Sequence, residues 1–214
     1  MKTKILLSFA FLVCAAITAH AQINKGRYLL GGSIGVSSSV SHQSTEMKNE
    51  GLGTNIQFGK VIKDNTVAGI IGWYNYNSGP QYKSNQYSAG VFYRKYKSIA
   101  KDLYLFGEGD ALYSYSKSTV GDFQIGSSAT RSISNGGSLS FIPGISYSIC
   151  KRMQMELVMQ NLFSLSYGVT KNEATNILTS TISSAKTDNF YAGINLNSAL
   201  LSNFGIGFKF LLGK

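Results

Sequence analysis

Apolar and polar residues alternate one by one along much of this chain, most clearly over residues 153–167, which read MQMELVMQNLFSLSY. The odd positions of this segment are apolar apart from Asn161, and the even positions are largely polar. A period of two predicts a β-strand with one apolar face, because successive side chains of a strand point to opposite sides. The segment is long for a soluble sheet. Taken alone, it leaves open whether the apolar face points into a soluble core or outward into lipid.

Seven other segments show related patterns, which brings the predicted number of strands to eight. The third of them is apolar on both faces, so its phase is undetermined. The last keeps one phase throughout, which favours one long strand, kinked near residues 197–203, over two strands joined by a turn. The seven segments are residues 28–37, 52–61, 66–76, 86–96, 103–115, 138–147 and 190–212.

The connections between these strands alternate in length. The short ones are residues 63–65, 97–102 and 150–152, and the long polar ones are residues 40–50, 77–85, 117–137 and 168–189. Short turns on one side and long loops on the other are typical of transmembrane β-barrels. The predicted fold is therefore all-β, an eight-stranded antiparallel up-and-down transmembrane β-barrel with short periplasmic turns and long extracellular loops. Its apolar faces would point to lipid, and closing the sheet would pair every strand edge.

Aromatic residues support this orientation because they gather near both ends of the predicted strands. Two such bands fit the interfacial girdles of a membrane barrel, whereas a simple preference of tyrosine for strands does not predict clustering at strand ends. Tyr74, Tyr76, Tyr87, Tyr113, Tyr115 and Tyr167 lie at the long-loop ends, and Tyr93, Tyr147, Phe208 and Phe210 at the short-turn ends.

The N-terminus has the pattern of a secretory signal peptide. Lys2 and Lys4 precede an apolar run, and residues 19–21 (Ala-His-Ala) offer a small-x-small cleavage site between Ala21 and Gln22. The apolar run is short for a spanning helix, which disfavours a retained anchor. We expect residues 1–21 to be removed and residues 22–214 to form one outer-membrane barrel domain.

The composition gives little indication of a catalytic, cofactor or metal site. The formal charge is +10 for the whole chain, and loss of Lys2 and Lys4 would leave +8, spread along the chain rather than gathered on a helix. That distribution favours an anionic membrane surface over nucleic acid. After cleavage, Cys150 and His42 are the single cysteine and histidine. No disulfide, catalytic site, cofactor site or metal site is therefore predicted, and residues 51–53 (Gly-Leu-Gly) read as barrel glycines rather than half of a dinucleotide motif.

Charged residues on the predicted inner faces are the main site candidates. By parity, Arg94, Glu108, Asp110, Glu156 and Lys209 point into the lumen, in its short-turn half. Paired carboxylates can perform acid–base chemistry. The structural interpretation is stronger, because buried charges in a narrow lumen must be paired or each costs several kcal/mol. We expect a plugging ion-pair cluster rather than a catalytic or conducting site.

The chain resembles the small eight-stranded outer-membrane barrels of Gram-negative bacteria, the OmpA- and OmpX-like barrels. The resemblance covers the whole mature chain and rests on GVFYRKY at 90–96, IPGISYS at 142–148, KRMQMEL at 151–157 and NFGIGFKF at 203–210. It implies a C-terminal aromatic strand recognised by the barrel-insertion machinery, here with Phe204, Phe208 and Phe210. The chain departs from the pattern by continuing to Lys214 where many relatives stop at an aromatic residue.

The expected function is that of an integral outer-membrane barrel without enzymatic activity. Its role would be structural or would lie in surface interactions through the long loops. The expected partners are outer-membrane lipid, lipopolysaccharide and an unidentified extracellular ligand, but no nucleic acid. The alternatives are a small passive pore, a lipid-modifying enzyme barrel and a soluble lipocalin-like binder.

Overall fold

The computed structural model describes residues 23–42, 46–121, 128–159, 162–176, 181–194 and 204–213. They form one antiparallel sheet of ten strands. No helix in these ranges is long and apolar enough to cross a bilayer. The strands are β1 (Tyr28–His42), β2 (Glu46–Lys63), β3 (Thr66–Gly79), β4 (Tyr82–Ala100), β5 (Leu103–Gly121), β6 (Ser128–Cys150), β7 (Met153–Met159), β8 (Phe163–Asn176), β9 (Thr181–Ile194) and β10 (Phe204–Leu212).

The ten strands make eight crossings of a barrel, which confirms the prediction of an all-β, eight-stranded antiparallel barrel. Strands β1 to β6 cross once each, β7 and β8 both pair with β6, and β9 and β10 pair with β8 and β7 respectively. The segment predicted as one strand over 190–212 thus corresponds to parts of β9 and β10. The kink expected at residues 197–203 lies outside the described residues.

The segment 153–167 is interrupted, so the prediction of one continuous strand there is wrong. Between two registered pairs, β6 advances three residues, from Phe141 to Gly144, while the opposite chain advances five, from Val158 to Phe163. Pro143 lies in this gap on β6 and has no backbone N–H to donate to a neighbouring strand. The excess of two residues is even, so β7 and β8 keep the same inward and outward parity.

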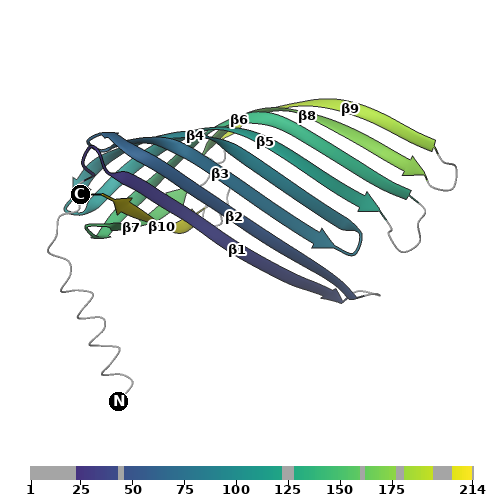
Figure 1. The fold of residues 1–214 in the computed structure, drawn as a ribbon, viewed down its shortest axis with the longest axis horizontal. Helices are drawn as coiled ribbons and strands as arrows, with labels where there is room; N and C mark the ends of the chain where they lie inside the picture. The colour runs from purple at the N-terminus through teal and green to yellow at the C-terminus, as the bar shows by residue number, and fades with distance from the viewer. Residues whose placement is uncertain are drawn as a thin grey trace, which may run out of the picture.

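The barrel closes only near its short turns. There β1 pairs with β10 over four residues, from Tyr28 opposite Leu212 to Gly31 opposite Lys209. Above that point β1 continues beside β2 alone, and β9 pairs with β8 alone, as far as the described residues extend. Figure 1 shows the result, a sheet whose β1 and β9 edges stand apart at the end away from the chain termini. We call this end the hairpin end and the other the short-turn end.

The predicted long loops are largely β-structure, because the prediction ended the strands too early. The polar segments 77–85 and 117–121, for example, belong to paired strands. Both faces of these extensions are polar, so the alternation that marks a strand in sequence disappears. The last registered pairs are His42–Glu46, Gly79–Tyr82, Gly121–Ala129 and Asn176–Thr181.

The short turns contain two residues that adopt left-handed backbone conformations. Asn65 has φ 59° and Asp102 has φ 61°. Asn and Asp tolerate this region better than other non-glycine residues, and tight hairpins use them for that reason. The turn expected at residues 97–102 is shorter than predicted, since β4 runs to Ala100.

The predicted inward and outward faces agree with the structure. On β7, Gln154 and Glu156 are fully buried, whereas Met155 and Leu157 are about 40% exposed. The structure also assigns the two faces of the third predicted strand, because Val67 and Ile71 point inward and Ile70 points outward. Most of the girdle aromatics are exposed on the outer face, and Tyr74 packs on Tyr87 across β3 and β4 with ring centroids 5.0 Å apart.

The short-turn end of the lumen is filled by apolar side chains. Ile23, just before the barrel, is buried together with Leu29, Val61, Val67 and Leu211. Backbone hydrogen bonds hold this leading segment across the opening, from Gly26 N–H to the Val61 carbonyl and from Asn65 N–H to the Ile23 carbonyl. Residues 23–27 therefore cover the lumen at this end.

Candidate functional site in the lumen

Arg94 on β4 is the centre of a buried charge network. Its Nε donates to Glu108 Oε2 on β5 at 2.5 Å, and its Nη1 donates to Glu156 Oε1 on β7 at 2.6 Å. All three side chains are at most 5% exposed. Parity places them inward, and the register puts Arg94 directly opposite Glu108 across β4 and β5. One guanidinium thus joins two carboxylates, and the three side chains come from three different strands.

Polar residues extend the network toward both neighbouring walls. Gln57 Nε2 on β2 donates to Glu108 Oε2 at 2.8 Å, and Lys209 Nζ on β10 donates to Gln57 Oε1 at 2.5 Å. Tyr96 lies beside the other carboxylate, with its hydroxyl 3.0 Å from Arg94 Nη1 and 3.4 Å from Glu156 Oε1. The network therefore spans the barrel from β10 through β2, β5 and β4 to β7.

An aromatic ring packs against this network, and glycines, which have no side chain, leave room for it. The Arg94 guanidinium carbon lies 4.3 Å from the centroid of the Phe106 ring, a cation–π distance. A Cβ on Gly144 would collide with the same ring, and a Cβ on Gly31 would collide with the Lys209 side chain. These inward glycines are what allow large side chains to fit in a narrow lumen.

Asp110 differs from the other inward carboxylates. It lies two residues above Glu108 on the same face of β5 and is only 4% exposed. It makes no ion pair or hydrogen bond within the described part of the chain, and its Oδ1 is a buried atom without a partner. A buried carboxylate in this state is costly unless a proton or an external cation neutralises it.

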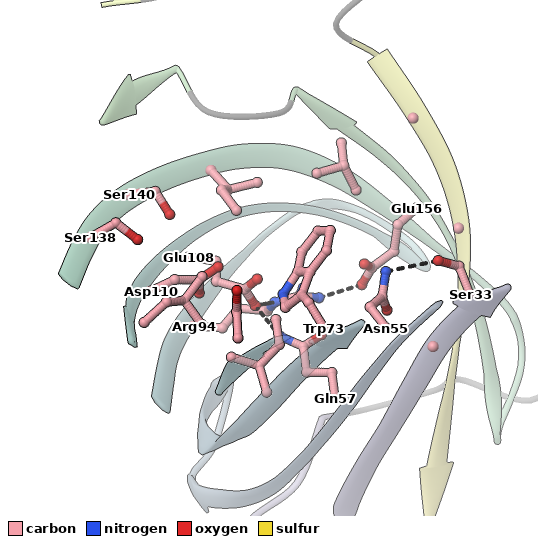
Figure 2. A pocket seen from close by; sticks show the side chains of 18 of the residues that line it. Ser33, Asn55, Gln57, Trp73, Arg94, Glu108, Asp110, Ser138, Ser140 and Glu156 are labelled. Atoms are coloured by element: carbon pink, nitrogen blue, oxygen red, sulfur yellow. Dashed lines mark hydrogen bonds and ion pairs between the residues drawn. The ribbon is translucent and has the colours of Figure 1, made fainter. Parts of the chain in front are cut away.

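A cavity of about 520 Å³ lies above the network, toward the hairpin end. Figure 2 shows the Trp73 indole projecting into the pocket, with Arg94, Glu108 and Asp110 on one side of it, Glu156 on the other, and Ser138 and Ser140 on the wall beyond Asp110. The lumen is therefore filled at the short-turn end and hollow above.

The structure brings together three of the five predicted cluster residues in direct ion pairs, namely Arg94, Glu108 and Glu156. Lys209 joins through Gln57 rather than through a carboxylate. Asp110 lines the same cavity but is outside the ion-pair network, which corrects its predicted place in the cluster.

The network contains none of the remaining predicted residues that the structure describes. His42 is the last residue of β1, and Cys150 is the last of β6 and is a free thiol. Phe208 and Phe210 face outward on β10, which also contains Phe204. Ala21 and Gln22 fall outside the described residues. No group of histidine, cysteine and acidic side chains that could hold a metal ion occurs in the described ranges.

Parity alone did not identify Gln57, Tyr96 and Trp73 as lumen residues of interest. Gln57 and Tyr96 have inward parity on their strands, so a search for every polar inward residue, rather than for charges, would have found them. Trp73 lies on β3, where both faces are apolar in sequence, so the alternation could not predict which side chains point inward.

Comparison with known proteins identifies the fold. No protein-family model and no curated protein sequence matches the chain. Among solved structures, the outer-membrane protein OprG from Pseudomonas aeruginosa aligns with a TM-score of 0.52 at 11% identity, over 92% of this chain and 99% of that chain. Neisserial surface protein A (NspA) aligns with a TM-score of 0.45 at 13% identity, over 87% and 97%. The chain has the fold of the small outer-membrane β-barrels.

Proposed function

We propose that this protein is an integral outer-membrane barrel of a Gram-negative bacterium. It has no enzymatic activity, its lumen is closed to solutes at the short-turn end, and its long hairpins form a surface for interactions. The fold shared with OprG supports the membrane location. So does the outward apolar surface bounded by aromatic residues, which a bilayer would cover.

The proposal of a closed lumen rests on two layers of side chains that cross the lumen one above the other. Ile23 and its apolar neighbours fill the short-turn end, and the Arg94 network crosses the lumen next to them. Opening a path would require breaking buried ion pairs, which costs several kcal/mol. A small passive pore, the main alternative, needs a continuous aqueous path that these layers interrupt.

The absence of enzymatic activity is supported by the kinds of side chains present in the lumen. Two of its carboxylates, Glu108 and Glu156, are engaged in ion pairs with Arg94 rather than free for proton transfer. The single histidine of the mature chain, His42, is at the hairpin end of β1, remote in register from these groups.

The surface role is supported by the extended hairpins. Their strands project beyond the aromatic band with polar residues on both faces, and several of these residues are basic, including Lys83, Lys117, Arg131, Lys171 and Lys186. Basic side chains near a membrane surface favour the anionic head groups of lipopolysaccharide. The partners of this proposal are therefore outer-membrane lipid, lipopolysaccharide, the barrel-insertion machinery during assembly and an extracellular ligand.

Purification, mass spectrometry and conductance measurements test the proposal. Protein purified from outer membranes should depend on detergent, migrate differently on gels before and after heating, and begin at Gln22 by mass spectrometry. In planar bilayers it should be insulating. A stable single-channel conductance in the wild type would contradict the closed lumen and favour the pore, and a product released from lipid substrates would favour the enzyme alternative.

A further inference from the structure

The cavity above the ion network is closed below and hollow above, which is the geometry of a binding cup. We propose that it binds an amphipathic organic cation, with a primary ammonium group at Asp110 and a hydrocarbon or aromatic body against Trp73 and the apolar wall. The volume of about 520 Å³ is within the range of small-molecule sites in proteins.

The charge balance of the cavity selects a cation. The charged residues that line it are Arg94, Lys209, Glu108, Asp110 and Glu156. Two are cations and three are carboxylates, so one negative charge is left over when all are ionised. Arg94 pairs with Glu108 and Glu156. The unpaired carboxylate is Asp110, which is 4% exposed and has an oxygen without a partner in the described structure.

Glu156 provides a useful contrast because its Oε2 also lacks a hydrogen-bond partner. Its other oxygen, however, accepts from Arg94 at 2.6 Å, so it has a charged partner, which Asp110 lacks in the described structure. Asp110 therefore has the stronger requirement for an external cation. An ammonium group meets it with charge-assisted hydrogen bonds.

The apolar part of the ligand is indicated by the cavity wall. Trp73, Leu112 and Val158 line the cavity from β3, β5 and β7. Figure 2 shows the Trp73 indole projecting into the space between Asp110 and Glu156. An indole face attracts both apolar groups and cations. A hydrated inorganic cation would leave this wall unused.

The point where β1 and β10 separate gives such a ligand a route from the outer surface. Gly32 and Ser33 of β1 line the cavity, and so do Ile206 and Phe208 of β10. The last β1–β10 pair is Gly31–Lys209, so these lining residues stand on the two sides of the separation. Ile206 and Phe208 have outward parity and are exposed, which means that the cavity reaches the outer face of the sheet here.

The single tryptophan of the sequence, Trp73, provides the readout. Refolded full-length mature protein in a zwitterionic detergent would be titrated with hexylammonium, and with hexanol and hexanoate as neutral and anionic probes of equal chain length. We expect a saturable change in Trp73 fluorescence with hexylammonium, at a dissociation constant about tenfold or more below that of either control. Asp110→Asn should remove this preference. Asp188→Asn, which removes the same charge from an exposed site on β9, should retain it.

Several results would overturn the proposal. They are no saturable response to hexylammonium in the wild type, equal binding of hexanol, or an Asp110→Asn variant that keeps the preference for the ammonium. Should Asp110→Asn fail to fold, as judged by heat-modifiable migration, the order of the three probes on the wild type still decides. The readout does not depend on conductance, so failure here is distinguishable from failure of the closed-lumen proposal.

Discussion

The short-turn half and the hairpin half of this barrel both contain ion pairs and glycines, but these residues lie in different surroundings. In the short-turn half, β1 meets β10, the ring closes, and inward side chains such as Arg94 and Glu156 are buried. In the hairpin half, β1 and β9 each have one partner strand in the described structure, and most side chains there are exposed on both faces. Loss of an ion pair or substitution of a glycine should therefore change the free energy of unfolding by very different amounts in the two halves.

The contrast follows from what each face meets. A closed ring with a narrow lumen forces inward side chains out of water, so each must be apolar or paired. Above the point where β1 and β10 separate, the other described strands stay paired with their neighbours but no longer enclose a narrow lumen, so their side chains are less buried on both faces. Four predictions test this difference, in order of decreasing effect.

Removing Arg94 should have the largest effect. Arg94→Ala leaves Glu108 and Glu156 facing each other without their cation, and an uncompensated buried partner costs about 3–5 kcal/mol. The loss in the free energy of unfolding should be measured by urea titration in detergent or liposomes at neutral pH. At acid pH the carboxylates take up protons and their repulsion disappears, so the gap to the wild type should narrow.

Arg94→Lys sharpens this result. It keeps the charge but loses the forked geometry that reaches both carboxylates, so it should cost less than the alanine variant. Wild-type stability of Arg94→Ala at every pH would mean that the network does not hold the lower barrel together.

An arginine placed on the outer face of one strand should have the next largest effect, and one placed on the inner face should have much less. Leu139 on β6 is exposed on the outer face, and its neighbour Ser138 lines the cavity. Leu139→Arg places a charge near the middle of the lipid-facing band, at about 2–4 kcal/mol. Ser138→Arg places it in a hollow beside carboxylates and should fold nearly as well as the wild type. The folded fractions of both variants in liposomes, read by heat-modifiable migration, should differ clearly. Equal fractions would mean that the faces are misassigned.

Glycine positions should show a smaller contrast. A Cβ on Gly69, on β3, would collide with the Phe58 carbonyl oxygen and the Gly59 backbone, which cannot move away easily. A Cβ on Gly35, where β1 has left β10, would meet only the Gly53 carbonyl oxygen at 3.9 Å. We expect Gly69→Ala to cost about 1–3 kcal/mol through overpacking and Gly35→Ala to cost little. Thermal unfolding of the two variants side by side would reveal any reversal of this order.

The smallest effect should come from an exposed ion pair of the hairpin half. Arg131 and Glu173 face each other on β6 and β8 at 3.9 Å, with side chains 47% and 45% exposed. Solvent screening limits such pairs to about 0–1 kcal/mol. Arg131→Ala should therefore unfold close to the wild type in the same urea titration that tests Arg94→Ala. A loss as large as that of Arg94→Ala would show that the two halves do not differ as described.

The sequence by itself determined the class of fold and the two faces of most strands. Alternation is a local property, so residues 103–115 or 153–159 reveal which side chains share a face without any knowledge of their neighbours. It also placed Arg94, Glu108 and Glu156 in the lumen, because parity carries over along a strand. The strand ends at the hairpins were missed, since polar residues on both faces leave no periodicity to detect.

Only the tertiary structure decided how the inward residues pair and where the lumen is hollow. Parity puts Glu108 and Asp110 on the same face, but the register decides that Arg94 lies opposite Glu108, so that Asp110 is left without a cation. The separation of β1 from β10 above Gly31 and Lys209 is equally invisible in the sequence, because both strands keep their alternation there. Pairing and cavities depend on the distances between strands far apart in the chain, and a one-dimensional pattern contains no such distances.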